Sequence, residues 1–218
     1  MHSTPPPSSQ KIAFFSLYRP SDGLNFAPKL LDLGWKILVT QNMSSVFSKS
    51  CIQAEEVSKF LEIQESYPFP PTLHPKMELA LTTSKTTTID LVFDTTYPLS
   101  EGNDVGGHTL LALAAKGNRI VVSNKKDMDK VVRQLICNEN SIEADFRKRL
   151  ITQAYEKNSR HYLKLSNHKE PNQATVAYEL MEGENPYQAP AHLLTFEDSD
   201  GLRLGKFKQL SGVKPCFT

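Results

Sequence analysis

The segment Lys11–Leu17 reads KIAFFSL and carries the strongest signal for the architecture of the chain. Its apolar residues follow one another without alternation, and turn residues come next at Arg19–Gly23, which is typical of a strand buried on both faces. Comparable runs return at Lys36–Thr40 (KILVT), Thr88–Thr95 (TIDLVFDT) and Arg119–Ser123 (RIVVS). These four runs predict the strands of one mostly parallel sheet.

Helical periodicity separates the predicted strands. Helices are expected over Leu24–Leu33, from Ser44, and over Gly106–Lys116, Asp127–Ile136 and Ile142–Leu165. Four prolines between Glu65 and Pro75 argue against regular structure in that segment. Strands that alternate with helices predict an α/β fold with helices on both faces of the sheet, and ligands of such sheets bind at the carboxyl ends of the strands.

Composition excludes several classes of function. The 218 residues carry 25 Lys plus Arg against 24 Asp plus Glu, so the basic balance of a nucleic-acid binder is absent. The three cysteines lie far apart in sequence, which favours free thiols over a disulfide framework or a metal site. No secretory signal or membrane-length apolar run is present. We expect a soluble cytoplasmic protein that needs no metal or cofactor and binds neither nucleic acid nor membrane.

The chain divides into three parts by composition. Residues 1–10 are rich in proline and serine and are expected to be a disordered tail. Residues 11–166 form the predicted α/β domain, and residues 167–218 begin with a polar linker and form the start of a second domain. Two strands are expected in this last part, at Val176–Met181 and His192–Phe196.

Six segments, in order, resemble motifs of one enzyme family. They are Phe26–Gly34 (FAPKLLDLG), Thr72–Pro75 (TLHP), Ile89–Pro98 (IDLVFDTTYP), Asn103–Lys116 (NDVGGHTLLALAAK), Phe146–Tyr155 (FRKRLITQAY) and Gly183–Ala191 (GENPYQAPA). Together they resemble the bifunctional enzyme that combines aminoimidazole-carboxamide ribonucleotide (AICAR) transformylase with inosine monophosphate (IMP) cyclohydrolase. Each motif alone is weak, but six in the family's order make chance agreement a poor explanation.

The resemblance implies a fold, an activity and an oligomeric state. The fold would be the methylglyoxal-synthase-like three-layer fold, and the reaction would close 5-formamido-AICAR ribonucleotide to IMP with loss of water. The family forms homodimers, and its partner molecule is a purine nucleotide. By this resemblance, the chain spans the cyclohydrolase domain and a truncated start of the transformylase half.

The resemblance also assigns site residues. Tyr97, Asp104 and Lys116 match the family's catalytic positions, and substrate-binding positions fall at Arg19, Thr72, His74, Thr95, Gly106 and Gly107. Each has a structural alternative. Asp104 would cap the following helix, Lys116 would complement the helix dipole, and Tyr97 would pack beside its neighbouring proline.

Several positions depart from the family pattern. Pro71 stands where the family has a lysine, and Phe69 stands where it has an arginine. The second phosphate loop reads VTQNM over Val39–Met43, so that Gln41 and Asn42 replace glycines that let the backbone approach a phosphate. The acid–base residues are therefore in register, whereas the phosphate-binding residues are not.

Three hypotheses follow. The chain is a cyclohydrolase with a rebuilt phosphate site, or a binding or scaffold module that has lost catalysis, or, with least support, an enzyme with methylglyoxal-synthase-like chemistry. A cation such as Arg19 or Lys76 directed into the crevice beside Tyr97 would favour the first. A crevice filled by Phe69, Pro71 and Met43 would favour the second.

Overall fold

The computed structural model describes residues 10–64, 66–83 and 88–166, and the backbone of two further strands at 174–180 and 191–196. The chain divides into two compact units, one that ends at Ser159 and one that begins at Arg160. The expected tail, apart from residue 10, and most of the predicted motif Gly183–Ala191 lie outside the described residues. The domain boundary predicted at residue 166 stays a prediction.

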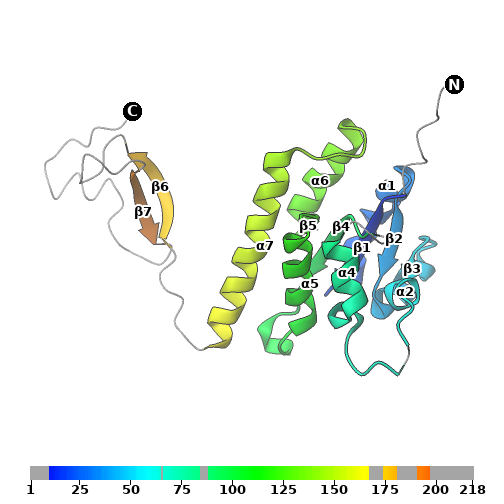
Figure 1. The fold of residues 1–218 in the computed structure, drawn as a ribbon. Coiled ribbons are helices and arrows are strands. Elements are labelled where there is room, and N and C mark those ends of the chain that lie inside the picture. The colour runs from blue at the N-terminus through cyan, green and yellow to red at the C-terminus, as the bar shows by residue number, and fades with distance from the viewer. Residues whose placement is uncertain (1–9, 65, 84–87, 167–173, 181–190, 197–218) are drawn as a thin grey trace, which may run out of the picture. The chain divides into compact units, whose positions relative to one another are not determined.

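A five-stranded parallel sheet forms the centre of the first unit (Figure 1). Its order is β3-β2-β1-β4-β5, and all its neighbouring strands run parallel. The strands are β1 (Ile12–Leu17), β2 (Lys36–Val39), β3 (Glu55–Glu56), β4 (Leu91–Thr95) and β5 (Ile120–Val122). The four predicted strands are confirmed, although β4 begins three residues later than expected, and β3 had no apolar signal because it consists of two glutamates.

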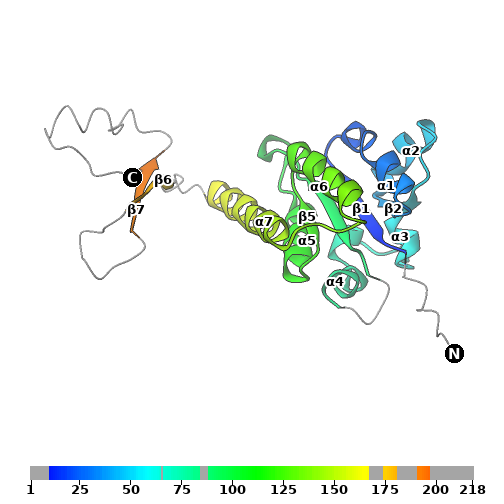
Figure 2. The ribbon, with the colours of Figure 1, turned by 90° about the horizontal axis from the view of Figure 1, so that it is seen from above.

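Helices cover both faces of this sheet (Figure 2). Helices α4 and α5 lie on one side, and α1, α2 and α6 lie on the other, which confirms the predicted three-layer α/β fold. The α-helices are α1 (Ala27–Asp32), α2 (Gln41–Lys49), α3 (Val57–Phe60), α4 (Pro75–Thr82), α5 (Val105–Lys116), α6 (Lys125–Cys137) and α7 (Ala144–Leu165). Short 3₁₀ helices are also present: η1 (Pro20–Gly23), η2 (Pro71–Leu73) and η3 (Leu99–Glu101).

Two expectations about local structure were wrong. The helix predicted from Leu24 begins only at Ala27, because the preceding residues continue the turn that follows η1. The proline-rich segment contains η2 and leads directly into α4, whose first residue is Pro75. Proline is favourable at the first position of a helix, where its missing N–H would have no intrahelical partner.

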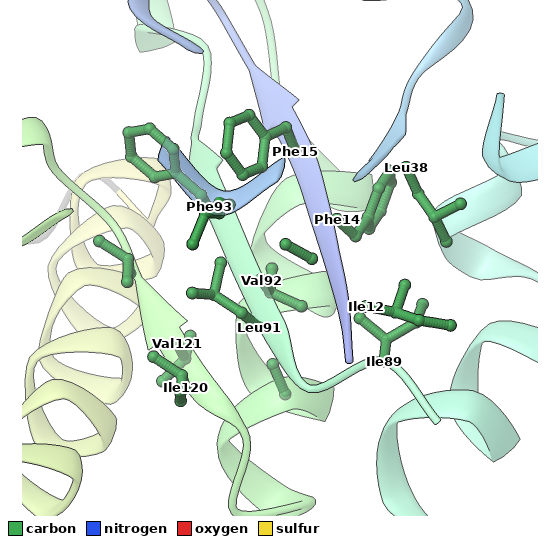
Figure 3. Close-up of a cluster of buried hydrophobic side chains, with 14 of the residues drawn as sticks. Ile12, Phe14, Phe15, Leu38, Ile89, Leu91, Val92, Phe93, Ile120 and Val121 are labelled. Atoms are coloured by element: carbon green, nitrogen blue, oxygen red, sulfur yellow. The ribbon is translucent and has the colours of Figure 1, made fainter. Parts of the chain in front are cut away.

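Continuous burial of the strands explains why their sequences do not alternate. Phe14, Phe15, Leu38, Val92 and Phe93 have no exposed surface, and their side chains pack from β1, β2 and β4 (Figure 3). Full burial of a side chain of this size contributes about 1.5–3 kcal/mol. The ring of Phe15 meets that of Phe93 edge to face, with centroids 5.5 Å apart.

The single tryptophan, Trp35, lies at the amino end of β2. It is buried, and its indole N–H donates to the side-chain oxygen of Asn140 at 2.9 Å. The amide of Asn140 in turn donates to the carbonyl of Leu33 at 3.1 Å. These bonds fasten the loop between α6 and α7 to the amino edge of the sheet.

The order of the strands fixes where a ligand can bind. The chain first builds outward from β1 to β2 and β3, and then returns to the other side of β1 to form β4 and β5. The direction of winding therefore reverses beside β1. In open α/β sheets, ligand sites form at the carboxyl ends of the strands next to such a reversal.

In the described residues of the second unit, β6 (Ala174–Leu180) and β7 (Ala191–Phe196) form an antiparallel pair, with an irregularity in register between Val176 and Tyr178. They correspond to the two strands predicted for this part of the chain. None of the helices in the described residues combines the length and the apolar character that a membrane crossing requires.

Close packing at the end of α5 generates a stability prediction. A Cβ atom on Gly117 would lie 1.9 Å from the carbonyl oxygen of Leu81, an atom that also accepts the Arg119 Nε–H at 2.6 Å. We expect Gly117→Ala to lower the free energy of unfolding by about 3 kcal/mol, as measured by urea denaturation.

Gly34→Ala is the matched control for this prediction. Gly34 has φ +81°, but a Cβ atom added there would meet no atom within 4 Å, so only backbone strain of about 1 kcal/mol applies. Equal losses in the two variants would contradict the steric explanation.

Candidate functional site

A cavity of about 950 Å³ opens at the carboxyl ends of β1, β2, β3 and β4. Residues that follow each of these strands form its walls, and η2 and the residue before α5 add further side chains. The main contributions come from 16–18, 40–42, 56–59, 70–72, Thr95, Tyr97 and Asp104. The cavity thus occupies the place that the sheet topology predicts for a ligand.

Asp104 is held rigidly in the cavity wall. Its Oδ1 atom accepts the backbone N–H of Gly107 at 2.7 Å, which caps α5, and its Oδ2 atom accepts the backbone N–H of Tyr97 at 3.1 Å. A Cβ atom on Gly107 would lie 2.6 Å from Oδ2, so this arrangement needs glycine there. The carboxylate of Asp104 therefore both caps α5 and lines the cavity.

Tyr97 and Tyr18 form an aromatic part of the same wall. Their rings meet edge to face with centroids 5.2 Å apart, and the Tyr97 side chain is 41% exposed. The Tyr18 hydroxyl donates to the carboxylate of Glu101, and this hydrogen bond raises the pKa of Tyr18. The Tyr97 hydroxyl carries no such acidic partner among the hydrogen bonds of the described residues.

Two threonines of the predicted set also line the cavity. Thr95 ends β4 in the wall, and its hydroxyl accepts the backbone N–H of Tyr18 at 3.0 Å. Thr72 is only 6% exposed, and its hydroxyl has no hydrogen-bond partner within the described part of the chain. A Cβ atom on Gly106 would lie 2.6 Å from that hydroxyl. Buried hydroxyls usually have a partner, so Thr72 is suited to meet a polar atom of a ligand.

Five of the predicted site residues are not among those that line this cavity: Arg19, His74, Gly106, Gly107 and Lys116. Lys116 ends α5, about 18 Å along the helix from Asp104, and pairs with Glu78 at 3.4 Å. His74 caps α4, with its Nδ1 atom accepting the backbone N–H of Lys76 at 3.1 Å. Arg19 is exposed, and its guanidinium lies 6.0 Å from the centre of the Tyr18 ring.

The residues chosen to separate the hypotheses give a mixed result. Lys76 does not line the cavity and instead donates to the carbonyl of Glu62 at 3.0 Å. Phe69 and Pro71 line the wall but leave the cavity open, and Met43 is buried with its sulfur accepting the N–H of Leu17. Among the described lining residues, the basic side chain is that of Lys59, at α3, which sequence reasoning did not single out.

Sequence reasoning also missed Asp94, a carboxylate near the end of an apolar strand. It is 1% exposed, lies opposite Ser16 in the β1–β4 register, and accepts a hydrogen bond from the Ser16 side chain. Burial raises the pKa of Asp94 to about 7, although the Ser16 hydrogen bond and the charge of Lys157 act to lower it. An acidic residue within the run LVFDT was the available signal.

Lys157, on α7, is the second missed residue. Its ammonium group donates to the carbonyl of Ser123 at 3.2 Å. Burial lowers the pKa of Lys157, and the nearby carboxylates of Asp94 and Asp104 oppose that shift. The structure therefore places Lys157, and not Lys116, within electrostatic range of Asp104. Within the described residues, no cluster of histidine, cysteine and acidic side chains has the arrangement of a metal site.

Comparisons with known proteins agree with the sequence resemblance. No model of a protein family matches the chain. The bifunctional purine biosynthesis protein PurH of Fusobacterium nucleatum subsp. nucleatum is 28% identical over 247 residues, which cover 95% of this chain and 48% of that protein. PurH of Leuconostoc citreum is 28% identical over 208 residues, which cover 76% of this chain and 40% of that protein. The chain thus spans less than half the length of these relatives.

A solved structure supports the fold. The crystal structure of ForH superposes with a TM-score of 0.64 and 20% sequence identity, covering 72% of this chain and 98% of that protein. At this identity the likeness concerns the fold alone. It agrees with the parallel sheet and the two helical layers of the first unit.

The buried Asp94 generates a prediction about pH and stability. Because its folded-state pKa is raised from 3.8 to about 7, the folded chain binds more protons than the unfolded chain between these values, and stability falls as the pH rises through them. We expect Asp94→Asn to remove this loss. Its free energy of unfolding, relative to that of the parent, should rise by up to about 4 kcal/mol between pH 4 and pH 8.

Urea denaturation at several pH values measures this difference. Asp145→Asn, at an exposed position in the first turn of α7, is the matched control and should leave the pH dependence of stability unchanged. A difference between Asp94→Asn and the parent that does not vary with pH would contradict the prediction.

Proposed function

Because the chain is a distant relative of the bifunctional purine biosynthesis protein PurH, we propose that its first unit binds a purine nucleotide in the cavity and catalyses the cyclohydrolase reaction. In that reaction 5-formamido-AICAR ribonucleotide closes to IMP with loss of water. The observation that carries the proposal is the convergence of Thr72, Thr95, Tyr97 and Asp104, which come from three separate family motifs, on one cavity.

The chemistry asks mainly for positioning and proton transfer. The attacking amide nitrogen and the formyl carbon belong to the same molecule, so the site has to hold the substrate in its folded conformer. Asp104 would accept the proton released by the attacking nitrogen, since its carboxylate is fixed by two backbone N–H groups at the wall. Tyr97 would donate a proton to the formyl oxygen, which becomes a hydroxyl group on the closed ring. The proton taken up by Asp104 would then let this hydroxyl leave as water, while a ring nitrogen gives its proton to the Tyr97 phenolate.

The phosphate group would bind at the opposite part of the wall. The first turn of α2 meets the cavity at Gln41 and Asn42, and the side chain of Thr40 makes no capping hydrogen bond there. Backbone N–H groups at the start of a helix attract anions. Lys59 would add the positive charge that the family obtains from positions occupied here by Phe69 and Pro71.

A second candidate function is a nucleotide-binding or scaffold module without turnover. It is favoured by Pro71, which offers no charge and no N–H in the wall, and by the position of Lys116 outside the cavity. This module would still bind the nucleotide, so binding and turnover have to be measured separately. The homodimer implied by the resemblance and the cytoplasmic location expected from the composition stay predictions. Analytical ultracentrifugation would test the homodimer.

Isothermal titration of the full chain with IMP tests binding. We expect a dissociation constant in the micromolar range, weakened at least about tenfold by Lys59→Ala because a charge-assisted hydrogen bond contributes about 1.5–3 kcal/mol. Lys116→Ala removes another exposed lysine, one outside the cavity, and should change the affinity less than about twofold. Absence of binding at millimolar IMP by folded protein would contradict the proposal.

Ring closure, followed by the appearance of IMP, tests catalysis. Asp104→Asn and Tyr97→Phe keep the shapes of the two side chains but remove the proton acceptor and the proton donor. Each should lower the rate at least about 100-fold while the affinity for IMP changes only a few-fold. Equal rates in the parent and both variants would contradict the proposed proton-transfer roles of Asp104 and Tyr97. Binding by the parent without turnover would instead support the module without catalysis.

A further inference from the structure

An aromatic surface lines the cavity on the side of η2. Tyr67 and Phe69 lie just before η2, and both line the cavity together with Pro70 and Pro71. The two rings meet edge to face with centroids 5.9 Å apart. Phe69 is 60% exposed, more than any other large hydrophobic residue in the described part of the chain. A bare apolar ring in a concave place is the kind of surface that a ligand covers.

Tyr67 holds this aromatic surface in place. Its hydroxyl donates to the carbonyl of Leu73 at 3.3 Å, and its ring meets the imidazole of His74 edge to face with centroids 4.7 Å apart. His74 is itself fixed, because its Nδ1 atom accepts the backbone N–H of Lys76 at the start of α4. The ring of Phe69 therefore rests on a support that is tied to η2 and α4, and little freedom is lost when a ligand packs on it.

The same side of the cavity is unsuited to a phosphate. Phe69 has no charge and no hydrogen-bond donor in its side chain, and Pro70 and Pro71 have no backbone N–H. Phosphates bind where cations or several backbone N–H groups meet them. In this cavity such groups lie on the other side, at the first turn of α2 and at Lys59 of α3.

The two sides belong to different layers of the fold. η2 packs on α4 and α5, whereas α2 packs on η1 and β3. α4 and α5 lie on one face of the sheet, and α2 lies on the other (Figure 2). A molecule with a charged end and a flat apolar end would therefore fit the cavity in one orientation, with its flat end against Phe69. The buried Thr72 hydroxyl, which has no partner within the described residues, adds a polar group on that side for the edge of a heterocycle.

We propose that Phe69 is the residue on which the heterocyclic base of the nucleotide packs, and that this contact orients the ligand with its phosphate toward α2 and Lys59. The inference rests on the proposed function for the class of ligand, and it deepens that function by naming the residue that recognises the base. The sequence resemblance places an arginine at position 69, so an aromatic contact here takes the place of a charged one. The chain would then depend on the base for a large part of its affinity.

Isothermal titration of the full chain with two probes separates the base contact from the phosphate contact. IMP carries both groups, whereas ribose 5-phosphate carries the phosphate alone and should bind at least about tenfold more weakly. We expect Phe69→Ala to weaken IMP binding about tenfold, because the base loses its stacking partner, and to change the binding of ribose 5-phosphate less than about twofold. Phe69→Tyr should keep the affinity of the parent for IMP, since it retains the ring.

Leu79→Ala is the matched control. Leu79 is another exposed hydrophobic residue, 48% exposed on α4 and outside the cavity, so its truncation should leave the affinity for IMP unchanged. Because Phe69 is mostly exposed, we expect Phe69→Ala to fold, and a urea midpoint close to that of the parent would check this.

The ring resonances of Phe69, assigned by comparison with Phe69→Tyr, report the contact in the parent chain itself. We expect IMP to shift them, and inosine, which has the base but no phosphate, to do the same, because a stacked base changes the magnetic environment of the ring. No shift with either probe would overturn the proposal. Equal losses of affinity for IMP and ribose 5-phosphate in Phe69→Ala would also overturn it.

Failure of the base contact and failure of the proposed function give different results. IMP binding that depends on Phe69, without ring closure, would contradict the catalytic role and support the base contact. Ring closure with an IMP affinity that Phe69→Ala leaves unchanged would contradict the base contact and leave the catalysis. A shift with inosine in a chain that does not bind IMP would support the base contact and contradict the phosphate site.

Discussion

The parallel pairing of β1 with strands on both of its sides is the constraint on which the site depends. β1 pairs with β2 through Ile12–Phe15 and with β4 through Ala13–Leu17. Parallel strands present their carboxyl ends at the same edge, so segments that are distant in sequence meet there. The buried aromatic residues of β1 hold this pairing in place, and without it the cavity would have no common wall.

The sequence predicted most of this framework because burial on both faces leaves an unmistakable run of apolar residues in each long strand. The same reasoning could not find β3, whose two glutamates carry no hydrophobic signal, or the start of α4 at a proline. Four of the residues named from the motifs, Thr72, Thr95, Tyr97 and Asp104, line the cavity. They lie at strand ends or helix starts, whose positions follow directly from the order of the elements.

The sequence motifs located the lysine of the site less well than its other residues, and the reason is the geometry of helices. A motif preserves spacing along the chain, but a straight helix of 12 residues carries its two ends far apart, so Lys116 and Asp104 cannot share a site through α5 alone. Lys157, which interacts electrostatically with Asp104, comes from α7, and the place of α7 depends on contacts between residues 50 positions apart, such as His108 with Asn158. Contacts of this kind have no local sequence signal.

The position of Trp35 gives the molecule two separate optical reporters. The indole is buried at the amino edge of the sheet and held by Asn140, whereas Tyr18, Tyr67 and Tyr97 line the cavity at the carboxyl edge. Tryptophan emission therefore follows the integrity of the α/β layers, and three of the seven tyrosines lie where a ligand in the cavity would perturb their absorbance. Unfolding and ligand binding can be observed at different wavelengths in the same unlabelled sample.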